Sequence, residues 1–257
     1  MSVNEHLDLA QRFIRLPVSQ REQFFRKMAA KGIGVAQLPI PAAKGGIERP
    51  PLSYGQQRQW FLWQLEPTST AYHIPLALRL RGVVDRAALQ RAFDALVARH
   101  ETLRTTFLQE EDRAVQVIHP TAAVAVEFVE LADVEELAAE TREARVRAWV
   151  EAEIGRPFDL TIGPLFRVTL LRVTAHEHVL VVVMHHIVSD GWSMPILVEE
   201  LAQLYEGCRC GHAVSLPELP IQYADYAIWQ RSWMEAGERQ RQLDYWVGRL
   251  GGEQPVL

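Results

Sequence analysis

One apolar run in the chain, Val179 to Met184, is not interrupted by any polar residue, and two histidines follow it directly. A run of this kind is typical of a strand buried on both faces. Side chains alternate along a strand, so His186 shares a face with Met184, whereas His185 points to the other side. We therefore expect one imidazole to face a reaction channel and the other to be packed into the fold.

The rest of the pattern predicts helices and short strands. Strands are predicted over 76–81, 105–108, 114–118, 124–131 and 166–173, the last joined by a hairpin turn to the run 179–187. Helices are predicted from Ser53 to a stop before Pro67, after a cap at Asp85, and over 134–154, 192–205, 222–234 and 236–250. Together they predict an α+β fold (an α/β sandwich) in which helices cover a mixed β-sheet.

The N-terminal part differs from this pattern. Ser19 and Glu22 form a capping box for a helix from about Gln20, and Gly32 supplies a left-handed stop. The Pro- and Gly-rich stretch that follows is typical of a linker. We predict a helical segment over 1–38, a linker over 39–50 and the main domain over 51–257. The N-terminal helix could dock a carrier partner from another polypeptide, but packing on the body of the domain is the favoured interpretation.

Composition narrows the class of protein. The chain has 257 residues, 48% of them hydrophobic, and a net charge of −5. It contains no basic tract for nucleic acid or an anionic membrane, no apolar run near the roughly 20 residues that span a bilayer, and no signal-peptide pattern. Cys208, Cys210 and His212 resemble a metal-site fragment, but four ligands are not available locally, and flanking glycines favour a mobile loop.

The segment from His185 to Gly191 carries the candidate chemistry. Taken alone, a histidine near a strand end is more often a satisfied core residue than a catalyst. A metal site would need neighbouring strand residues to reach one ion, although their side chains diverge. The third interpretation is a catalytic histidine held at a strand-to-helix turn, and composition alone does not select it.

The order of four segments along the chain selects the interpretation as a catalytic histidine. His185 to Gly191 is similar to the HHxxxDG signature of the condensation domains of nonribosomal peptide synthetases and of chloramphenicol acetyltransferase-like acyltransferases. Residues 53–62 resemble the family's first motif, SxAQxRxWxL, with Gly55 in place of the usual Ala. Residues 99–107 resemble RHExLRTxF, and residues 223–230 resemble YxDYAxWQ. Four such segments in the right order make a strong signal, and the resemblance extends over nearly the whole chain from Leu52.

The resemblance implies a chloramphenicol acetyltransferase-like lobe and peptide-bond formation. An acyl group on an upstream carrier protein would be transferred to the amine of an aminoacyl group on a downstream carrier. Both substrates would arrive as thioesters on phosphopantetheine arms, with no bound cofactor or metal, in the cytoplasm. The arms would meet at the second histidine of the motif, His186, which we expect chiefly to orient the amine and the tetrahedral intermediate through a hydrogen bond.

The other motif residues have two interpretations each. Asp190 could be a catalytic carboxylate or could hold the turn by pairing with a buried arginine, and the resemblance favours the second, with Arg104 as the expected partner. Gly191 could allow close backbone approach at a tunnel wall or could be an ordinary turn glycine. His185 is the histidine that we expect to be packed into the fold.

Condensation domains have two lobes, and this chain resembles only the first. We expect residues 51–257 to be the N-terminal lobe, with the C-terminal lobe absent, and the fragment to fold but to catalyse poorly alone. An epimerisation domain and a coenzyme A-dependent O-acyltransferase remain alternative enzymes. A platform that recruits carrier proteins or tailoring enzymes is the non-catalytic alternative.

Overall fold

The computed structural model describes residues 3–34, 38–43, 48–121, 123–131 and 133–252. The chain divides into two compact units. One comprises residues Gly55–Leu219, and the other joins Met1–Tyr54 to Pro220–Leu257. We describe each unit by itself.

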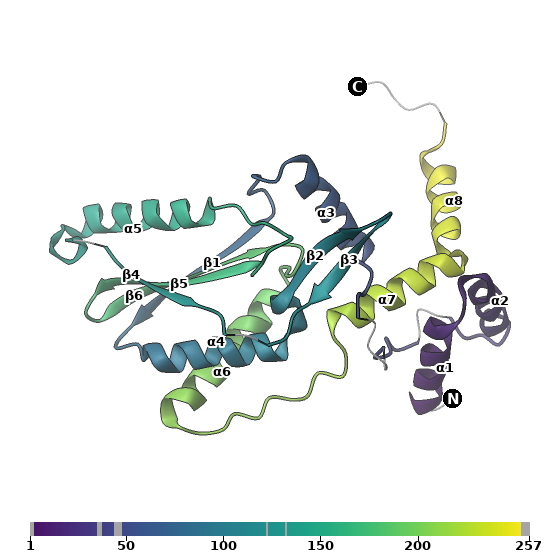
Figure 1. Ribbon diagram of the computed structural model, residues 1–257, viewed down its shortest axis with the longest axis horizontal. Helices are drawn as coiled ribbons and strands as arrows, with labels where there is room; N and C mark the ends of the chain where they lie inside the picture. Colours follow the sequence, from purple (N-terminus) through teal and green to yellow (C-terminus); the bar gives the residue numbers. More distant parts are fainter. Residues whose placement is uncertain (1–2, 35–37, 44–47, 122, 132, 253–257) are drawn as a thin grey trace. The chain divides into compact units, whose positions relative to one another are not determined.

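A four-stranded sheet in the order β1-β6-β5-β4 is the centre of the Gly55–Leu219 unit (Figure 1). Its strands are β1 (His73–Arg81), β4 (Val126–Glu130), β5 (Phe166–Thr174) and β6 (Glu177–His185). Only the β4–β5 pair is parallel, so the sheet is mixed. β6 is central and buried from His178 onward, which confirms the expectation from its unbroken apolar run.

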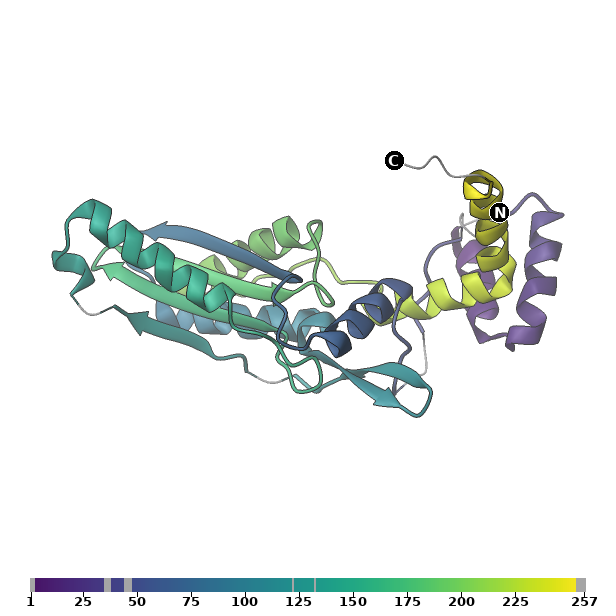
Figure 2. The same cartoon turned by 90° about the horizontal axis from the view of Figure 1, so that it is seen from above.

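Helices cover both faces of this sheet (Figures 1 and 2). On one face lie α4 (Arg86–Arg99) and α6 (Ser193–Cys210), and on the other lies α5 (Ala139–Ile154). The α4–α6 side encloses the main apolar core, to which β6 contributes Leu180, Val182 and Met184. The α+β fold predicted from the sequence is thereby confirmed. Asp85 caps α4 as expected, because its carboxylate accepts a hydrogen bond from Ala88 N–H at 2.9 Å.

The same unit contains a helix, a β-hairpin and short 3-10 turns beside the sheet. The helix is α3 (Tyr54–Leu65), whose first residue belongs to the other unit, and the hairpin joins β2 (Thr105–Glu110) to β3 (Arg113–Ile118). The 3-10 turns are η2 (Glu101–Arg104) and η3 (Val134–Glu136). α3 ends before Pro67, as the position of that proline predicts.

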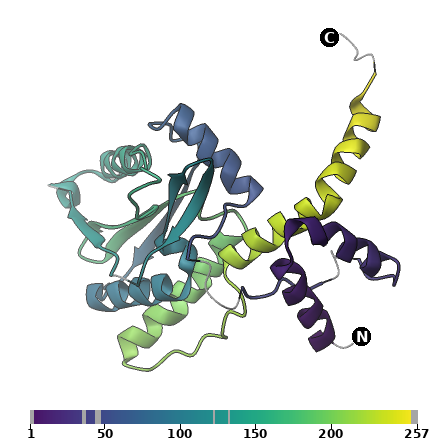
Figure 3. The same ribbon diagram turned by 45° about the vertical axis from the view of Figure 1, so that its right-hand side comes forward.

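The second unit is helical (Figure 3). It contains α1 (Val3–Arg15), α2 (Val18–Ala29), α7 (Tyr223–Trp233), the single π-turn η4 (Met234–Glu238) and α8 (Arg239–Leu250). Phe13, Met28 and Ala236 are core residues shared by its N- and C-terminal parts. Gly237, at φ 103°, supplies the left-handed residue at the bend between α7 and α8.

Several expectations differ from this arrangement. The sequence analysis missed α1 and placed the start of α2 two residues late. In the second unit, α2 packs on α7 and η4. The boundaries at 38 and 50 stay a prediction. Of the predicted linker, residues 44–47 lie outside the described residues, as do 1–2 and 35–37 of the predicted helical segment.

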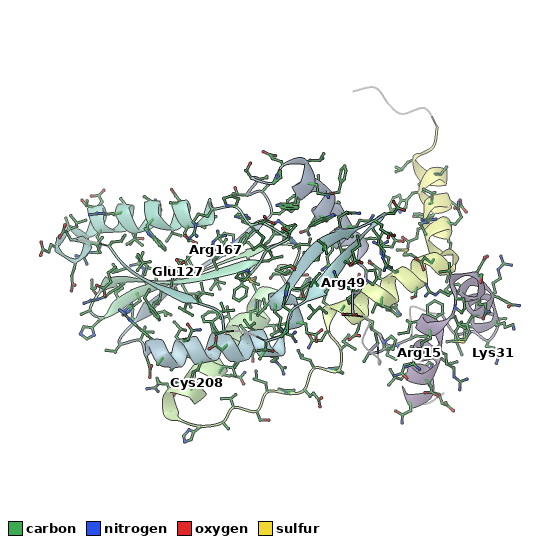
Figure 4. The ribbon with its side chains drawn as sticks, viewed as in Figure 1. Arg15, Lys31, Arg49, Glu127, Arg167 and Cys208 are labelled. Carbon is green, nitrogen blue, oxygen red and sulfur yellow. The ribbon has the colours of Figure 1, made fainter. Side chains whose placement is uncertain are left out.

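The two cysteines do not lie in a loop. Cys208 and Cys210 occupy the last turn of α6, which continues to Cys210 and ends at the left-handed Gly211 (Figure 4). Both thiols are free. Over the described ranges, no three His, Cys, Asp or Glu side chains are grouped as a metal site would require. Nor does any described helix have the length and apolar character needed to cross a membrane.

Candidate functional site

The backbone at the end of β6 is held on both sides. His185 N–H donates to Leu165 O at 2.9 Å, and His186 N–H donates to Tyr72 O at 2.8 Å. The two acceptors, Leu165 and Tyr72, immediately precede β5 and β1, the neighbours of β6 in the sheet. The two imidazoles therefore leave a fixed backbone in the opposite directions that strand alternation predicts.

His185 is the packed histidine. Its side chain is 3% exposed and lies among the rings of Tyr72, His73 and Phe158, at centroid distances of 6.3, 6.2 and 6.3 Å. Burial, and then the neighbouring imidazoles of His73 and His186, lower the pKa of His185 to about 4. His185 is therefore neutral at physiological pH.

The tautomer of His185 follows from one contact. The backbone N–H of Ile187 donates to His185 Nδ1 at 3.1 Å. A backbone N–H can only donate, so Nδ1 must be the unprotonated nitrogen and Nε2 must carry the hydrogen. His73 has the opposite arrangement, because its Nδ1 lies 2.8 Å from Ile154 O, a group that can only accept.

His186 is the exposed histidine. Its Nδ1 lies 3.5 Å from Gln59 Nε2, and Gln59 is 8% exposed. Gln56, one turn earlier on the same face of α3, donates to Ile187 O at 3.2 Å. Two buried amides of the first motif thus bind the turn that carries the histidines. The sequence analysis missed Gln59 because it occupies a variable position of that motif.

Asp190 and Arg104 are not partners, and this expectation was wrong. Asp190 is exposed and accepts hydrogen bonds from Ser193, at 2.9 Å from the backbone N–H and 2.6 Å from the hydroxyl. These bonds lower the pKa of the Asp190 carboxyl, the hydroxyl bond most. Arg104 instead donates to His119 O at 2.6 Å and contacts Glu101 at 3.5 Å, because it lies at the end of η2 beside β3.

Gly191 is exposed, and a Cβ built on it would meet no described atom within 4 Å. Its φ does not lie in the left-handed region. Close backbone approach is therefore absent around Gly191 within the described part of the chain. Next to it, Trp192 is 88% exposed, which leaves the start of α6 open.

A buried carboxylate explains the first two residues of the RHExLRTxF segment. Glu200 on α6 receives a hydrogen bond from Arg99 Nε at 3.1 Å and lies 2.6 Å from His100 Nε2. Its side chain is 12% exposed. The cluster joins the end of α4 to the helix that follows the histidine turn, so these motif residues position α6. From the sequence alone, nothing in the 192–205 helix distinguished Glu200 from Glu199.

A second buried carboxylate supports the His185 side. Glu153 binds Arg167, which is labelled in Figure 4, at 2.9 Å. The Arg167 guanidinium lies 4.0 Å from the centroid of the Phe158 ring. Phe158 meets His185 edge-on. Burial lowers the pKa of Arg167 from its ordinary value. A chain of contacts therefore runs from α5 through β5 to the packed histidine.

Comparisons with known proteins agree with this geometry. The family model described as "Condensation domain" matches residues 48–257. A linear gramicidin synthase of Brevibacillus parabrevis is 46% identical over 207 residues, and malpinin synthetase of Mortierella alpina is 42% identical over 207 residues. Each match covers 80% of this chain and 3% of the relative.

Solved structures share the fold. The X-domain from teicoplanin biosynthesis is 35% identical with a TM-score of 0.70, and the match covers 84% of this chain and 46% of that one. The first condensation domain of the calcium-dependent antibiotic synthetase, solved with a substrate analogue, is 26% identical with a TM-score of 0.68, covering 81% and 49%. The chain thus spans about half the length of these solved chains.

Proposed function

Because the chain belongs to the condensation domain family, we propose that it carries the histidine motif of a site that forms peptide bonds in nonribosomal peptide synthesis. The donor would be an acyl or peptidyl thioester on an upstream carrier protein. The acceptor would be the amine of an aminoacyl thioester on a downstream carrier. The observation that carries the proposal is the exposure of His186 beside a buried, neutral His185.

The energetics favour alignment as the main task of this site. The amine nitrogen attacks the thioester carbonyl, the C–N bond forms, the C–S bond breaks and the thiol leaves with the proton that the amine has lost. A free α-amine has a pKa near 8, so its deprotonation at neutral pH costs about 1 kcal/mol. A general base contributes about 3–5 kcal/mol, whereas alignment of two reactants contributes about 7–11 kcal/mol.

The contact with Gln59 supports an orienting role for His186. An amide N–H that donates to Nδ1 leaves the hydrogen on Nε2, so the exposed side of the ring is a hydrogen-bond donor. A donor at that position would stabilise the oxygen of the tetrahedral intermediate. The proton of the amine would then pass to the leaving thiolate or to water, and proton transfer through His186 would be secondary.

The remaining motif residues would act through the backbone. His185 would fix the backbone after β6 by accepting the hydrogen bond from Ile187 N–H. Asp190 would fix the first turn of α6 by accepting the hydrogen bond from the Ser193 hydroxyl. No residue here is proposed to bind a cofactor, because the phosphopantetheine arms come with the carriers. We propose that the part of the solved relatives that this chain does not span supplies the rest of the site, including the second lobe.

The test is His186→Ala in the longest polypeptide that carries this chain, assayed with donor- and acceptor-loaded carriers. We expect peptide formation to fall about 10²- to 10³-fold, as for loss of one hydrogen-bond donor to the intermediate, with unchanged thermal unfolding because the side chain is exposed. His176→Ala is the matched control, since His176 is an exposed histidine in the β5–β6 turn. Activity within a few-fold of wild type in His186→Ala would contradict the proposal.

A recruitment platform is the second candidate, because the teicoplanin X-domain, 33% identical to this chain, has been solved in complex with OxyB. For a platform, loaded carriers or a tailoring enzyme would bind, but neither carrier-bound nor coenzyme A-bound donors would turn over. Turnover with carriers but not with free coenzyme A esters supports condensation and excludes the O-acyltransferase.

A further inference from the structure

A pocket of about 260 Å³ opens beside the packed histidine. Its wall includes Leu62 and Trp63 of α3, Ala71 and Tyr72 of the loop that leads into β1, and His185. All of these residues belong to the Gly55–Leu219 unit. The pocket therefore lies within one compact body, and the exposed His186 is not part of its lining.

The wall is largely apolar, and its polar groups are distributed unevenly. Glu66 lines the pocket and is exposed, as is Leu65 at 67%, so the mouth is on the α3 side. The indole N–H of Trp63 is already donated to Phe158 O at 3.1 Å. Trp63 thus contributes an apolar ring face to the pocket and no free hydrogen-bond donor.

His185 provides a fixed donor in this wall. Its Nδ1 is occupied by the Ile187 amide, so the hydrogen is on Nε2, at the other side of the ring. Within the described residues, Nε2 of His185 is not one of the buried side-chain atoms without a partner, whereas Nε2 of the neighbouring His73 is. Because His185 lines the pocket, its Nε2–H is accessible there and can donate to water or to a ligand.

We propose that this pocket binds a neutral, largely apolar ligand through a carbonyl oxygen that accepts a hydrogen bond from His185 Nε2–H. The binding site does not depend on the peptide-forming activity proposed above. A carboxylate would meet no positive charge at the base of the pocket, since the pKa of His185, lowered to about 4 by burial, leaves it neutral, and Glu66 lies at the mouth. An ammonium group could not use a donor at all.

An occupant would border the backbone that holds both histidines. Tyr72 lines the pocket, and its carbonyl accepts the hydrogen bond from the His186 amide. Two sources supply the required chemistry, namely the acyl group of a thioester and a free amide such as a peptide product. The probes must separate them.

The experiment uses the full 257-residue chain labelled with ¹⁵N-histidine, without carriers and without turnover. The probes are S-methyl hexanethioate, hexanamide, hexanoate and hexylamine, which share one chain length and differ in the head group. We expect the first two to shift the His185 Nε2–H resonance saturably and the last two to bind about tenfold more weakly or worse. Tighter binding of the thioester identifies an acyl donor as the source, and tighter binding of the amide identifies a free amide.

Filling the pocket supplies the second arm. Ala71→Trp places a large ring at an exposed lining position, and Ala175→Trp makes the same change in an exposed turn outside the lining. Ala71→Trp should weaken hexanamide about tenfold, with Ala175→Trp unchanged. Ser69→Trp is the substitute should Ala71→Trp unfold.

Two results overturn the inference, namely equal binding of hexylamine and hexanamide, or hexanamide affinity that a folded filled variant leaves unchanged. His186→Ala should bind the probes as wild type does. Retained probe binding in a protein that does not form peptide bonds would therefore contradict only the peptide-forming proposal. Peptide formation without probe binding would contradict only the proposed ligand site.

Discussion

The two sides of β6 at its C-terminal end differ although one sequence pattern produces both. Behind the strand, His185 lies among aromatic rings, 3% exposed, with its pKa lowered to about 4 by burial. On the opposite side, His186 is exposed, and its Nδ1 lies 3.5 Å from the Gln59 amide of α3. A one-residue step along a strand is therefore enough to separate a neutral structural imidazole from an accessible one.

The two sides are also supported in different ways. The His185 side depends on a buried ion pair, because Glu153 and Arg167 hold Phe158 against the ring. The His186 side depends on hydrogen bonds from uncharged amides, Gln56 and Gln59. Removing one partner of the buried ion pair should lower the free energy of unfolding more than removing one uncharged amide does.

The largest effect is expected from Glu153→Ala. The substitution leaves the Arg167 guanidinium, 17% exposed, without its carboxylate. Loss of one partner of a buried pair costs about 3–5 kcal/mol of unfolding free energy. Glu143→Ala, also on α5, removes a 48%-exposed partner of Arg79 and should cost at most about 1 kcal/mol. Urea unfolding of both variants checks this, and equal losses would mean that the His185 side has no special support.

The next effect is a pH dependence that the His185 side should produce. Above its ordinary pKa of 6.5, His185 is neutral in both the folded and unfolded states, so the full stability is present. Below pH 6.5 the unfolded chain takes up a proton that the folded chain refuses until about pH 4. The folded state therefore loses stability as the pH falls through this window, by about 3 kcal/mol in total.

His185→Asn tests the origin of that slope. The Asn carboxamide oxygen can still accept the Ile187 N–H but does not titrate. We expect the difference in unfolding free energy between wild type and variant to shrink as the pH falls from 6.5 to 4. The pKa of His73 is also lowered by burial, so part of the slope remains in the variant. A pH-independent difference would show that His185 is not the group that titrates.

The fold could be predicted from the sequence because its elements depend on local patterns. The Asp85 cap, the stop before Pro67 and the apolar run of β6 each act over a few residues. Strand alternation predicts that His185 and His186 point to opposite faces, and the family resemblance selects His186 as the accessible one. Predictions failed where contacts between distant segments decide. The sequence pattern did not select Arg104 as the partner of His119 O, because that contact joins η2 to the end of β3.

The candidate site was predictable only as far as single residues. The family resemblance selected Arg104 as the partner of Asp190, but the structure places that guanidinium on His119 O and Glu101. Glu153 and Glu200, two carboxylates that are buried and paired, were not selected. Their sequence surroundings are those of exposed helical glutamates, and only the tertiary arrangement places Arg167 beside Glu153 and Arg99 beside Glu200.

Asp190→Asn tests whether Asp190 pairs with Arg104 or only accepts hydrogen bonds from Ser193. A buried Asp190–Arg104 pair would make the substitution cost about 3–5 kcal/mol. With an exposed Asp190 that only accepts hydrogen bonds from Ser193, the substitution should cost less than the about 0.5–2 kcal/mol of losing such an acceptor, because Asn can keep an acceptor in the same place. Thermal unfolding decides between the two, with Ser193→Ala as the control that removes the hydroxyl bond from the other side. Loss above about 3 kcal/mol in Asp190→Asn would contradict the capping role.

The smallest effect is expected at Gln59, which supports His186 through a single amide contact of 3.5 Å. Gln59 Oε1 is buried without a partner among the described residues, so the side chain has no other bond that fixes its orientation.

In Gln59→Leu, a residue of similar size cannot donate to Nδ1, and we expect His186 to populate both neutral tautomers. In Gln59→Glu, the carboxylate can only accept, which should move the hydrogen from Nε2 to Nδ1. The ¹⁵N shifts of the His186 ring report the tautomer directly, and the matching change Gln57→Leu, at an exposed position two residues away in the same motif, serves as the control. Peptide formation should fall by only a few-fold in Gln59→Leu and further in Gln59→Glu, because an Nε2 without hydrogen cannot donate to the intermediate. Were Gln59→Glu to work better than wild type, His186 would be acting as a base, and the open side of β6 would carry out proton transfer instead of orientation.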